Sequence, residues 1–245
     1  MGSSIRLDQL LVQKGLAESR EKAQRLIRAG AVRHDNTIYS KPGMNVAVDT
    51  PVTVDTPPRY VSRGGEKLEA ALAYFSVPVE GRTVLDIGAS TGGFTDCVLQ
   101  HGAGYVYAVD VGKGQLHWRL RNDPRVESRE GINARDLLPS DFKSSPDMLV
   151  VDVSFISLTK VLPAADAVLQ AGSVAVTLIK PQFEAGREQV GKGGVIRDPG
   201  VHDEVIKRVC LFGQESLAWT CVGVIPSPLK GPAGNIEFLA YWSKP

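Results

Sequence analysis

Two lysines and two carboxylates stand at or near the ends of segments that the sequence predicts to be ordered: Lys67, Asp152, Lys180 and Glu237. Asp152 interrupts the apolar run 148–153, and Lys180 directly follows the apolar run 174–179. A charge at such a place costs desolvation energy unless it is paired. Two acids and two bases cancel formally. Such a set can hold an alcohol oxygen and remove its proton, because desolvation or a second cation brings a lysine toward neutrality.

Apolar runs alternate with helical patterns from residue 65 onward, which indicates an α/β domain that positions these residues. In an open sheet of this class, ligands bind at the carboxyl ends of the strands. We expect helices over 65–75, 95–101, 112–121, 158–170 and 201–212, and strands over 83–87, 105–109, 148–153, 174–179, 218–225 and 236–241, with a weak strand from residue 126.

Two of the four charged residues admit a second interpretation from their expected elements. Lys67 lies near a helix start, where a cation opposes the helix dipole. It is therefore either a plain surface lysine or a lysine paired with an acid or an anion. Glu237 stands in the last apolar segment, and a glutamate buried in a strand needs a cationic partner.

The stretch 83–94, TVLDIGASTGGF, predicts a buried strand, a tight glycine turn and a helix. Its glycine spacing departs from G-x-G-x-x-G, the dinucleotide pattern, so a different nucleoside ligand is expected. The order D-x-G-x-x-x-G resembles that of S-adenosylmethionine-dependent methyltransferases, which implies that Asp86 lies near the ligand's amino group and that the helix N-terminus faces a carboxylate. The alternative is a purely structural glycine turn.

Two further polar residues fit a nucleoside. Asp110 ends the next predicted strand, a little over twenty residues after Asp86, where an acid can accept both ribose hydroxyls. Asn133 lies at the place where the third loop of this fold contacts an adenine ring. A simple helix cap by Asn133 is the equal alternative.

Composition bounds the class of protein. The 245 residues leave room for one α/β domain and a small module, and a net charge of +1 does not favour nucleic-acid binding over the whole chain. The three cysteines have no C-x-x-C spacing, so neither a disulfide framework nor a zinc site is expected. No membrane span or secretory signal is recognisable, and we expect a reduced, cytoplasmic protein.

The first fifty residues predict a separate module. Two short tandem helices are expected, the second capped by Ser19 and ended by Gly30, followed by short strand-like pieces from Val32 to Val54. An excess of positive charge gathers on and around the second helix, which suits phosphate contact, although a solvated helix face is the plainer alternative. The candidate RNA-binding residues are Arg6, Arg20, Lys22, Arg25, Arg28 and Arg33.

Two segments connect or interrupt the expected elements. The paired prolines in 55–62, DTPPRYVS, predict an extended linker. The glycine-rich, charged segment 186–198 is either a mobile loop, or else a lid or an RNA contact through Arg187, Lys192 and Arg197.

Longer motifs carry a family resemblance. Residues 5 to about 54 look like the alpha-L RNA-binding domain of a ribosomal small-subunit protein and of pseudouridine synthases. The whole chain, with SRGGEKL, LDIGASTGGFTD, VVDVSFISL, LIKPQFE and GNIEFL, resembles the hemolysin-A (TlyA) family of ribosomal RNA 2'-O-methyltransferases, whose catalytic domain is FtsJ-like.

This resemblance implies a fold and a domain order. The fold is α/β, a doubly wound, mostly parallel seven-stranded Rossmann-like methyltransferase sheet preceded by the alpha-L domain. The expected bounds are 1–54 for the RNA-binding domain, 55–62 for the linker and 63–245 for the methyltransferase domain.

The resemblance also implies a reaction. S-adenosylmethionine would methylate the 2'-hydroxyl of cytidine in ribosomal RNA, with no metal. Lys180 would activate the oxygen, Asp152 and Glu237 would orient Lys180, and Lys67 would complete the charge balance. The residues expected at the donor are Asp86, Gly88, Ser90, Gly92, Gly93, Asp110 and Asn133. The linker RYVSRGG differs from the tetrapeptide that tunes donor binding in some members, so that role is not carried over.

Two other functions compete with this one. The family's historical name suggests a pore-forming or membrane-lytic protein, which would lyse erythrocytes without a cofactor. A non-catalytic RNA-binding protein on a methyltransferase scaffold would bind RNA tightly without turnover.

Overall fold

The computed structural model describes residues 4–55 and 58–245, which divide into two compact units. The N-terminal unit extends to Pro58, and the C-terminal unit runs from Arg59 to Pro245. Of the expected linker, residues 56–57 lie outside the described part of the chain, as do residues 1–3. Tyr60, from the second half of that segment, is 2% exposed and belongs to the core of the C-terminal unit.

The N-terminal unit contains both expected tandem helices, α1 (Leu7–Gln13) and α2 (Arg20–Arg28). The Ser19 side chain accepts a hydrogen bond from the backbone N–H of Lys22, which caps α2 as its sequence predicts. Gly30 ends the helix with a positive φ of 71°. The strands β1 (Ser4–Arg6) and β4 (Asn45–Ala47) pair antiparallel, and a second small sheet has the order β3-β2-β5, formed by Thr37–Tyr39, Val32–His34 and Thr53–Val54.

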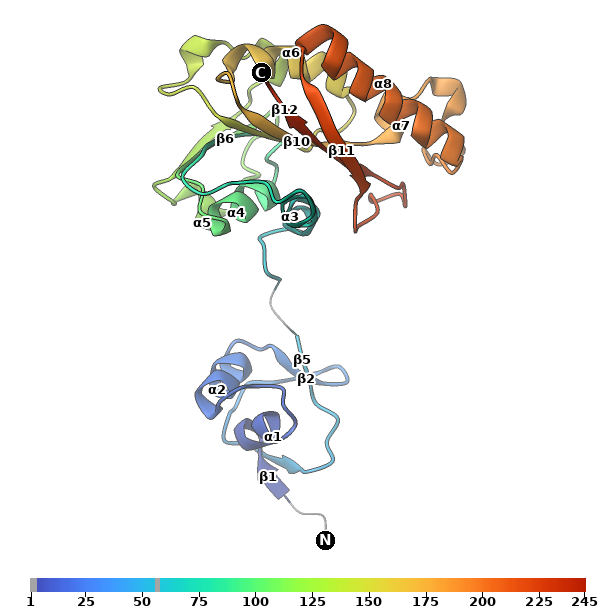
Figure 1. Ribbon diagram of the computed structural model, residues 1–245. Coiled ribbons are helices and arrows are strands. Elements are labelled where there is room, and N and C mark those ends of the chain that lie inside the picture. Colours follow the sequence, from blue (N-terminus) through green and yellow to red (C-terminus); the bar gives the residue numbers. More distant parts are fainter. Residues whose placement is uncertain (1–3, 56–57) are drawn as a thin grey trace. The chain divides into compact units, whose positions relative to one another are not determined.

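The C-terminal unit is built on a seven-stranded sheet of order β11-β12-β10-β9-β6-β7-β8 (Figure 1). Neighbours from β10 to β8 are parallel, and β12 runs antiparallel to both β10 and β11. This confirms the mostly parallel, seven-stranded fold class. The strands are β6 (Thr83–Ile87), β7 (Tyr105–Asp110), β8 (Val126–Glu130), β9 (Met148–Val151), β10 (Val174–Ile179), β11 (Thr220–Pro226) and β12 (Phe238–Ser243).

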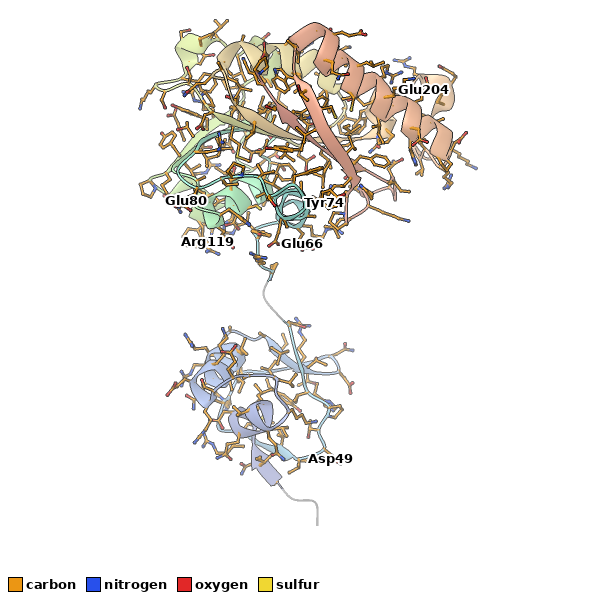
Figure 2. All side chains as sticks on the ribbon, in the orientation of Figure 1. Asp49, Glu66, Tyr74, Glu80, Arg119 and Glu204 are labelled. Carbon is orange, nitrogen blue, oxygen red and sulfur yellow. The ribbon has the colours of Figure 1, made fainter. Side chains whose placement is uncertain are left out.

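Helices cover both faces of this sheet, and each face has its own apolar core. One face carries α3, α4 and α5, and the other carries α6, α7 and α8 (Figure 1). Charged side chains such as Glu66, Glu80 and Glu204 lie at the surface (Figure 2). The helices are α3 (Gly64–Phe75), α4 (Gly93–Gln100), α5 (Trp118–Arg121), α6 (Leu158–Val168), α7 (Pro181–Glu184) and α8 (Pro199–Leu217).

One expected helix is mostly absent. The segment 112–121 is helical only over α5, and residues 112–117 form a turn-rich loop. The carboxylate of Glu130, at the end of β8, accepts hydrogen bonds from the backbone N–H groups of Gly114, Gln115 and Leu116 at 2.8–3.2 Å. These donors are satisfied by a side chain rather than by a helical turn, so the helix prediction was wrong there.

Three other bounds differ in ways that affect the site. β9 ends at Val151, so Asp152 lies just beyond the strand rather than within it. Glu237 precedes β12 instead of lying inside it, because β12 begins at Phe238. The helix expected over 201–212 is longer, since Asp198 caps it and Pro199 occupies its first turn. Within the described residues, no helix has the length and apolar character needed to cross a membrane.

Candidate active site

The four charged residues form two ion pairs. Lys180 Nζ lies 2.6 Å from Asp152 Oδ1, and Lys67 Nζ lies 2.5 Å from Glu237 Oε2. The first pair joins the ends of two neighbouring parallel strands, β10 and β9. The second joins α3 to the segment before β12, across 170 residues of sequence. The pairing answers both open questions of the sequence, because Lys67 is not a plain surface lysine and Glu237 has its cationic partner.

Burial makes these pairs more than surface contacts. The side chain of Glu237 is 1% exposed and that of Lys67 is 12% exposed. Within the described residues, the only ion pair of Glu237 is with Lys67. Among the described residues, the ion-pair and side-chain hydrogen-bond partners of Lys180 Nζ are Asp152 and Ser154, so Glu237 makes neither contact with Lys180.

A cavity of about 480 Å³ has all four charged residues in its wall. The glycine loop after β6 forms another part of the wall through Gly88, Ser90 and Gly93. Arg63 and Lys230 add two further cations. The wall of this cavity thus combines charged side chains with the glycine loop. We call it the tetrad cavity.

A second cavity of about 470 Å³ adjoins the first. Its polar wall includes Asp110 and Asn133, and its apolar wall includes Val109, Ile132 and Phe155. A planar base with a polar edge fits such a lining. We call it the nucleoside cavity. Four residues line both cavities, and they mark the boundary between them: Gly88, Ser90, Asp152 and Ser154.

Close packing explains the glycines of the loop. Gly88 has a φ of 84°, and a Cβ atom there would lie 2.3 Å from the backbone oxygen of Asp152. Gly92 has a φ of 101°, and its Cβ would lie 2.2 Å from a methyl group of Leu120. The structural interpretation therefore accounts for the residue type at both positions. The same turn nevertheless walls both cavities through Gly88.

The carboxylate of Asp110 is fixed by the backbone. Ser90 N–H donates to Oδ2 at 2.8 Å, and Gly112 N–H donates to Oδ1 at 2.6 Å. Each oxygen keeps a lone pair for a ligand hydroxyl. Glu130, which sequence reasoning missed, holds the adjoining loop, and the backbone N–H of Gly114 is the largest of the contacts that lower its pKa to about 2.

Asn133 serves as a cap and lines the cavity at once. Its side-chain oxygen accepts a hydrogen bond from the backbone N–H of Arg135 at 3.2 Å, at the start of the 3-10 helix Ala134–Asp136. Asn133 also lines the nucleoside cavity. The two alternatives for this residue are therefore compatible, because capping uses the side-chain oxygen and leaves the amide N–H groups.

Asp86 lies beneath the glycine loop and lines neither cavity. It is fully buried, its Oδ2 accepts a hydrogen bond from Thr95 Oγ1 at 2.6 Å, and burial raises its pKa to about 7. Its Oδ1 has no hydrogen-bond partner among residues 4–55 and 58–245. Burial without a cationic partner therefore favours the protonated form of this carboxyl group.

In the N-terminal unit, the six candidate cations differ in their partners. Arg6 and Arg20 pair with the buried Asp8 at 3.1 and 3.2 Å, and the hydrogen bond from Arg6 is the largest contribution that lowers the pKa of Asp8. Arg33 pairs with Asp55 at 2.5 Å. The remaining three are exposed on α2 and have no ion pair within the described residues; we call them the α2 cation trio: Lys22, Arg25 and Arg28.

Sequence reasoning missed several residues of the two cavity walls. Ser154 and Phe155 lie two and three residues after Asp152, and a signal was present because ligands bind where the strand ends. Lys230 lies in the proline-glycine loop before Glu237 and carries no pattern of its own. Among the described residues, no group of three or more His, Cys, Asp or Glu side chains is arranged to hold a metal ion.

Comparison with known proteins agrees with this architecture. The FtsJ-like methyltransferase family matches residues 60–244, and the S4 domain family matches residues 5–52. A Mycobacterium tuberculosis protein named 16S/23S rRNA (cytidine-2'-O)-methyltransferase TlyA is 48% identical over 243 residues, which cover 98% of this chain and 90% of that protein. The chain belongs to the TlyA family of FtsJ-like methyltransferases.

Other similar proteins carry different names. Hemolysin A of Brachyspira hyodysenteriae is 44% identical, with 97% of this chain and 99% of that protein covered. A solved structure from Streptococcus thermophilus, described as "Putative hemolysin", has a TM-score of 0.75 and 46% identity, covering 100% of this chain and 90% of that one. The TlyA family therefore includes proteins named after rRNA methylation and proteins named after haemolysis. The S4 match confirms the RNA-binding module expected at the N-terminus.

Proposed function

We propose that this TlyA-family chain transfers a methyl group from S-adenosylmethionine to the 2'-hydroxyl of a cytidine in ribosomal RNA. The observation that carries the proposal is the tetrad cavity next to the nucleoside cavity, with Asp152 in the wall of both. One cavity suits the nucleoside of the donor, and the other suits the acceptor oxygen. The printed names of the M. tuberculosis relative and of the matched FtsJ-like family support the same reaction.

The nucleoside cavity fits the donor. Asp110 would accept hydrogen bonds from the ribose hydroxyls, and Asn133 would reach the adenine with its amide group. Asp86 is fully buried and lines neither cavity, so it would hold the glycine loop that follows it rather than contact the donor directly. The glycine loop over Gly88, Ser90, Gly92 and Gly93 would carry the amino-acid end. When bound, S-adenosylmethionine supplies an electrophilic methyl group on a sulfonium centre.

The tetrad would act on the acceptor ribose. A 2'-hydroxyl is a weak nucleophile until it is oriented or deprotonated. Lys180 Nζ, held by Asp152, would bind the 2'-oxygen and take its proton as the oxygen attacks. Lys67, held by Glu237, would contact the same ribose from the other ion pair. The two pairs carry no net charge, and Arg63 and Lys230 make the cavity wall positive, which suits an anionic RNA strand. Positioning supplies much of the rate.

The N-terminal unit would hold the ribosomal RNA. The α2 cation trio occupies positions three residues apart on one helix, so its members share a side of α2 and can meet one phosphate backbone. Because ribosomal RNA is the substrate, we place the reaction in the cytoplasm.

The test is methyl transfer from labelled S-adenosylmethionine to isolated ribosomal subunits and intact ribosomes that lack the modification. We expect label on a cytidine 2'-oxygen, located by mapping the modified nucleotide. Lys180→Ala should abolish transfer and leave donor binding intact. Lys160→Ala removes an exposed lysine of α6 that lines neither cavity, so this control should retain full activity.

Two results would count against the proposal. Saturable donor binding without label on any RNA would favour a non-catalytic RNA-binding role. Retained transfer in Lys180→Ala would reject the role assigned to that lysine while leaving the reaction in place.

A further inference from the structure

Lys180 has a second side-chain partner besides Asp152. Its Nζ donates a hydrogen bond to Ser154 Oγ at 2.9 Å and lies 2.6 Å from Asp152 Oδ1. The neutral amine, which is the form that can take a proton, has two N–H donors and one lone pair, so both donors are engaged and the lone pair remains. Two fixed partners on one side of Nζ leave the third position for a group in the tetrad cavity.

The position of Ser154 makes this contact relevant to the reaction. Ser154 lines both the tetrad cavity and the nucleoside cavity. Its hydroxyl therefore stands where the proposed donor and the proposed acceptor meet, next to the amine that would take the proton.

Separate contacts tie the loop of Ser154 to the segment that follows Lys180. Glu184, the last residue of α7, accepts hydrogen bonds from Ser157 Oγ at 2.6 Å and from Leu158 N–H at 2.7 Å. The rings of Phe155 and Phe183 lie 5.0 Å apart. Three contacts thus hold the loop after β9 against the end of α7, so the segments that carry Ser154 and Lys180 are tied to each other.

We propose that Ser154 is a positioning residue, whose hydroxyl holds Lys180 Nζ together with Asp152 so that the remaining position of the amine faces the acceptor 2'-oxygen. The inference rests on the proposed function. Ser154 acts through Lys180 and accepts an N–H from it, while the hydroxyl proton of Ser154 remains free to donate to a neighbouring acceptor. Asp152 supplies a negative charge next to Lys180 Nζ, and Ser154 fixes the direction in which the amine points.

The substitution Ser154→Ala removes the acceptor and keeps the backbone. Loss of one hydrogen bond corresponds to a rate loss of about tenfold when the geometry that it fixes is needed only at the reacting step. We therefore expect kcat under saturating donor and RNA to fall about tenfold, with KM for both unchanged. Ser154→Thr restores a hydroxyl, and because Ser154 is exposed there is room for the added methyl group. We expect its kcat within about twofold of the wild type.

The measurement is single-turnover and steady-state methyl transfer to isolated ribosomal subunits, with donor binding measured separately. Ser216→Ala, at an exposed position of α8 outside both cavities, is the matched serine control and should behave as wild type. An unchanged kcat in Ser154→Ala would overturn the inference. So would a change confined to KM, which would make Ser154 a substrate contact, or a threonine variant as slow as the alanine variant. Absence of transfer in the wild type would instead reject the proposed function.

Discussion

The Lys67–Glu237 pair gives a stability prediction that can be worked from its burial. Lys67→Met removes the cation and leaves the Glu237 carboxylate, only 1% exposed, without its partner. Removing one member of a buried ion pair costs about 3–5 kcal/mol. Because the Lys67 side chain is itself 12% exposed and water can reach the vacated place, we expect about 3 kcal/mol, at the lower end of that range.

Replacing both members should recover most of this loss. Lys67→Met combined with Glu237→Met substitutes apolar side chains of similar volume for the pair, and such replacements are often neutral in buried sites. The double variant should therefore be more stable than Lys67→Met alone by about 2 kcal/mol or more. Methyl transfer should be lost in both variants, because both remove part of the tetrad.

Urea unfolding followed by tryptophan fluorescence is a suitable assay. All three tryptophans, Trp118, Trp219 and Trp242, lie in the C-terminal unit, so the signal reports the unit that contains the ion pair. Trp219 and Trp242 are 1% and 0% exposed, which makes their emission sensitive to unfolding. The reasoning is refuted if Lys67→Met lowers the free energy of unfolding by less than about 1 kcal/mol. It is also refuted if the losses of Lys67→Met and Glu237→Met, each measured alone, simply add in the double variant.

Three further predictions follow. Replacing the α2 cation trio with alanine should weaken RNA binding and reduce the slope of the logarithm of the binding constant against the logarithm of the salt concentration by about 2–3. Titration at several salt concentrations measures this slope, and an unchanged slope would exclude phosphate contact. Burial raises the pKa of Asp86 from 3.8 to about 7, so between these pH values the folded state keeps a proton that the unfolded state releases. The free energy of unfolding should therefore fall by about 4 kcal/mol as pH rises from about 4 to 7, and then level off. Urea unfolding of Asp86→Asn across this range should lack that slope, and an identical slope would assign it to other groups. The Cβ of Gly88→Ala would lie 2.3 Å from the backbone oxygen of Asp152, so this variant should lose more than about 3 kcal/mol of unfolding free energy and all activity. Gly172 has a φ of 74° but no atom within 4 Å of the added Cβ, so Gly172→Ala should lose only about 1 kcal/mol in the same unfolding assay.

The sequence was informative wherever the signal was local. The apolar runs before Asp152 and Lys180 predicted buried strands, and parallel strands in one sheet bring such ends to the same edge. Ser19 and Gly30 marked the ends of α2 because capping depends on residues within one turn. The glycine loop was recognisable since its residue types reflect backbone conformation.

The sequence failed where a distant side chain decided the local structure. Residues 112–117 carry a pattern that helices tolerate, but the carboxylate of Glu130 takes the backbone donors that a helical turn would use. Likewise, the four charged residues could be grouped from a helix start, two strand ends and the last apolar segment, yet which lysine meets which acid depends on three-dimensional register. Glu237 therefore pairs with Lys67 rather than Lys180.

The sequence separation of the second ion pair also bears on when the enzyme can first work. Lys67 and Glu237 meet across 170 residues, and Glu237 directly precedes β12, which fills the place between β10 and β11 in the sheet. Contacts of such long range form late in folding, because the entropy of closing the intervening chain must first be overcome. During synthesis, all residues that line the nucleoside cavity, from Ile87 to Val161, are added before Glu237. The set of four charged residues is therefore complete only after the segment that precedes β12 has taken its place.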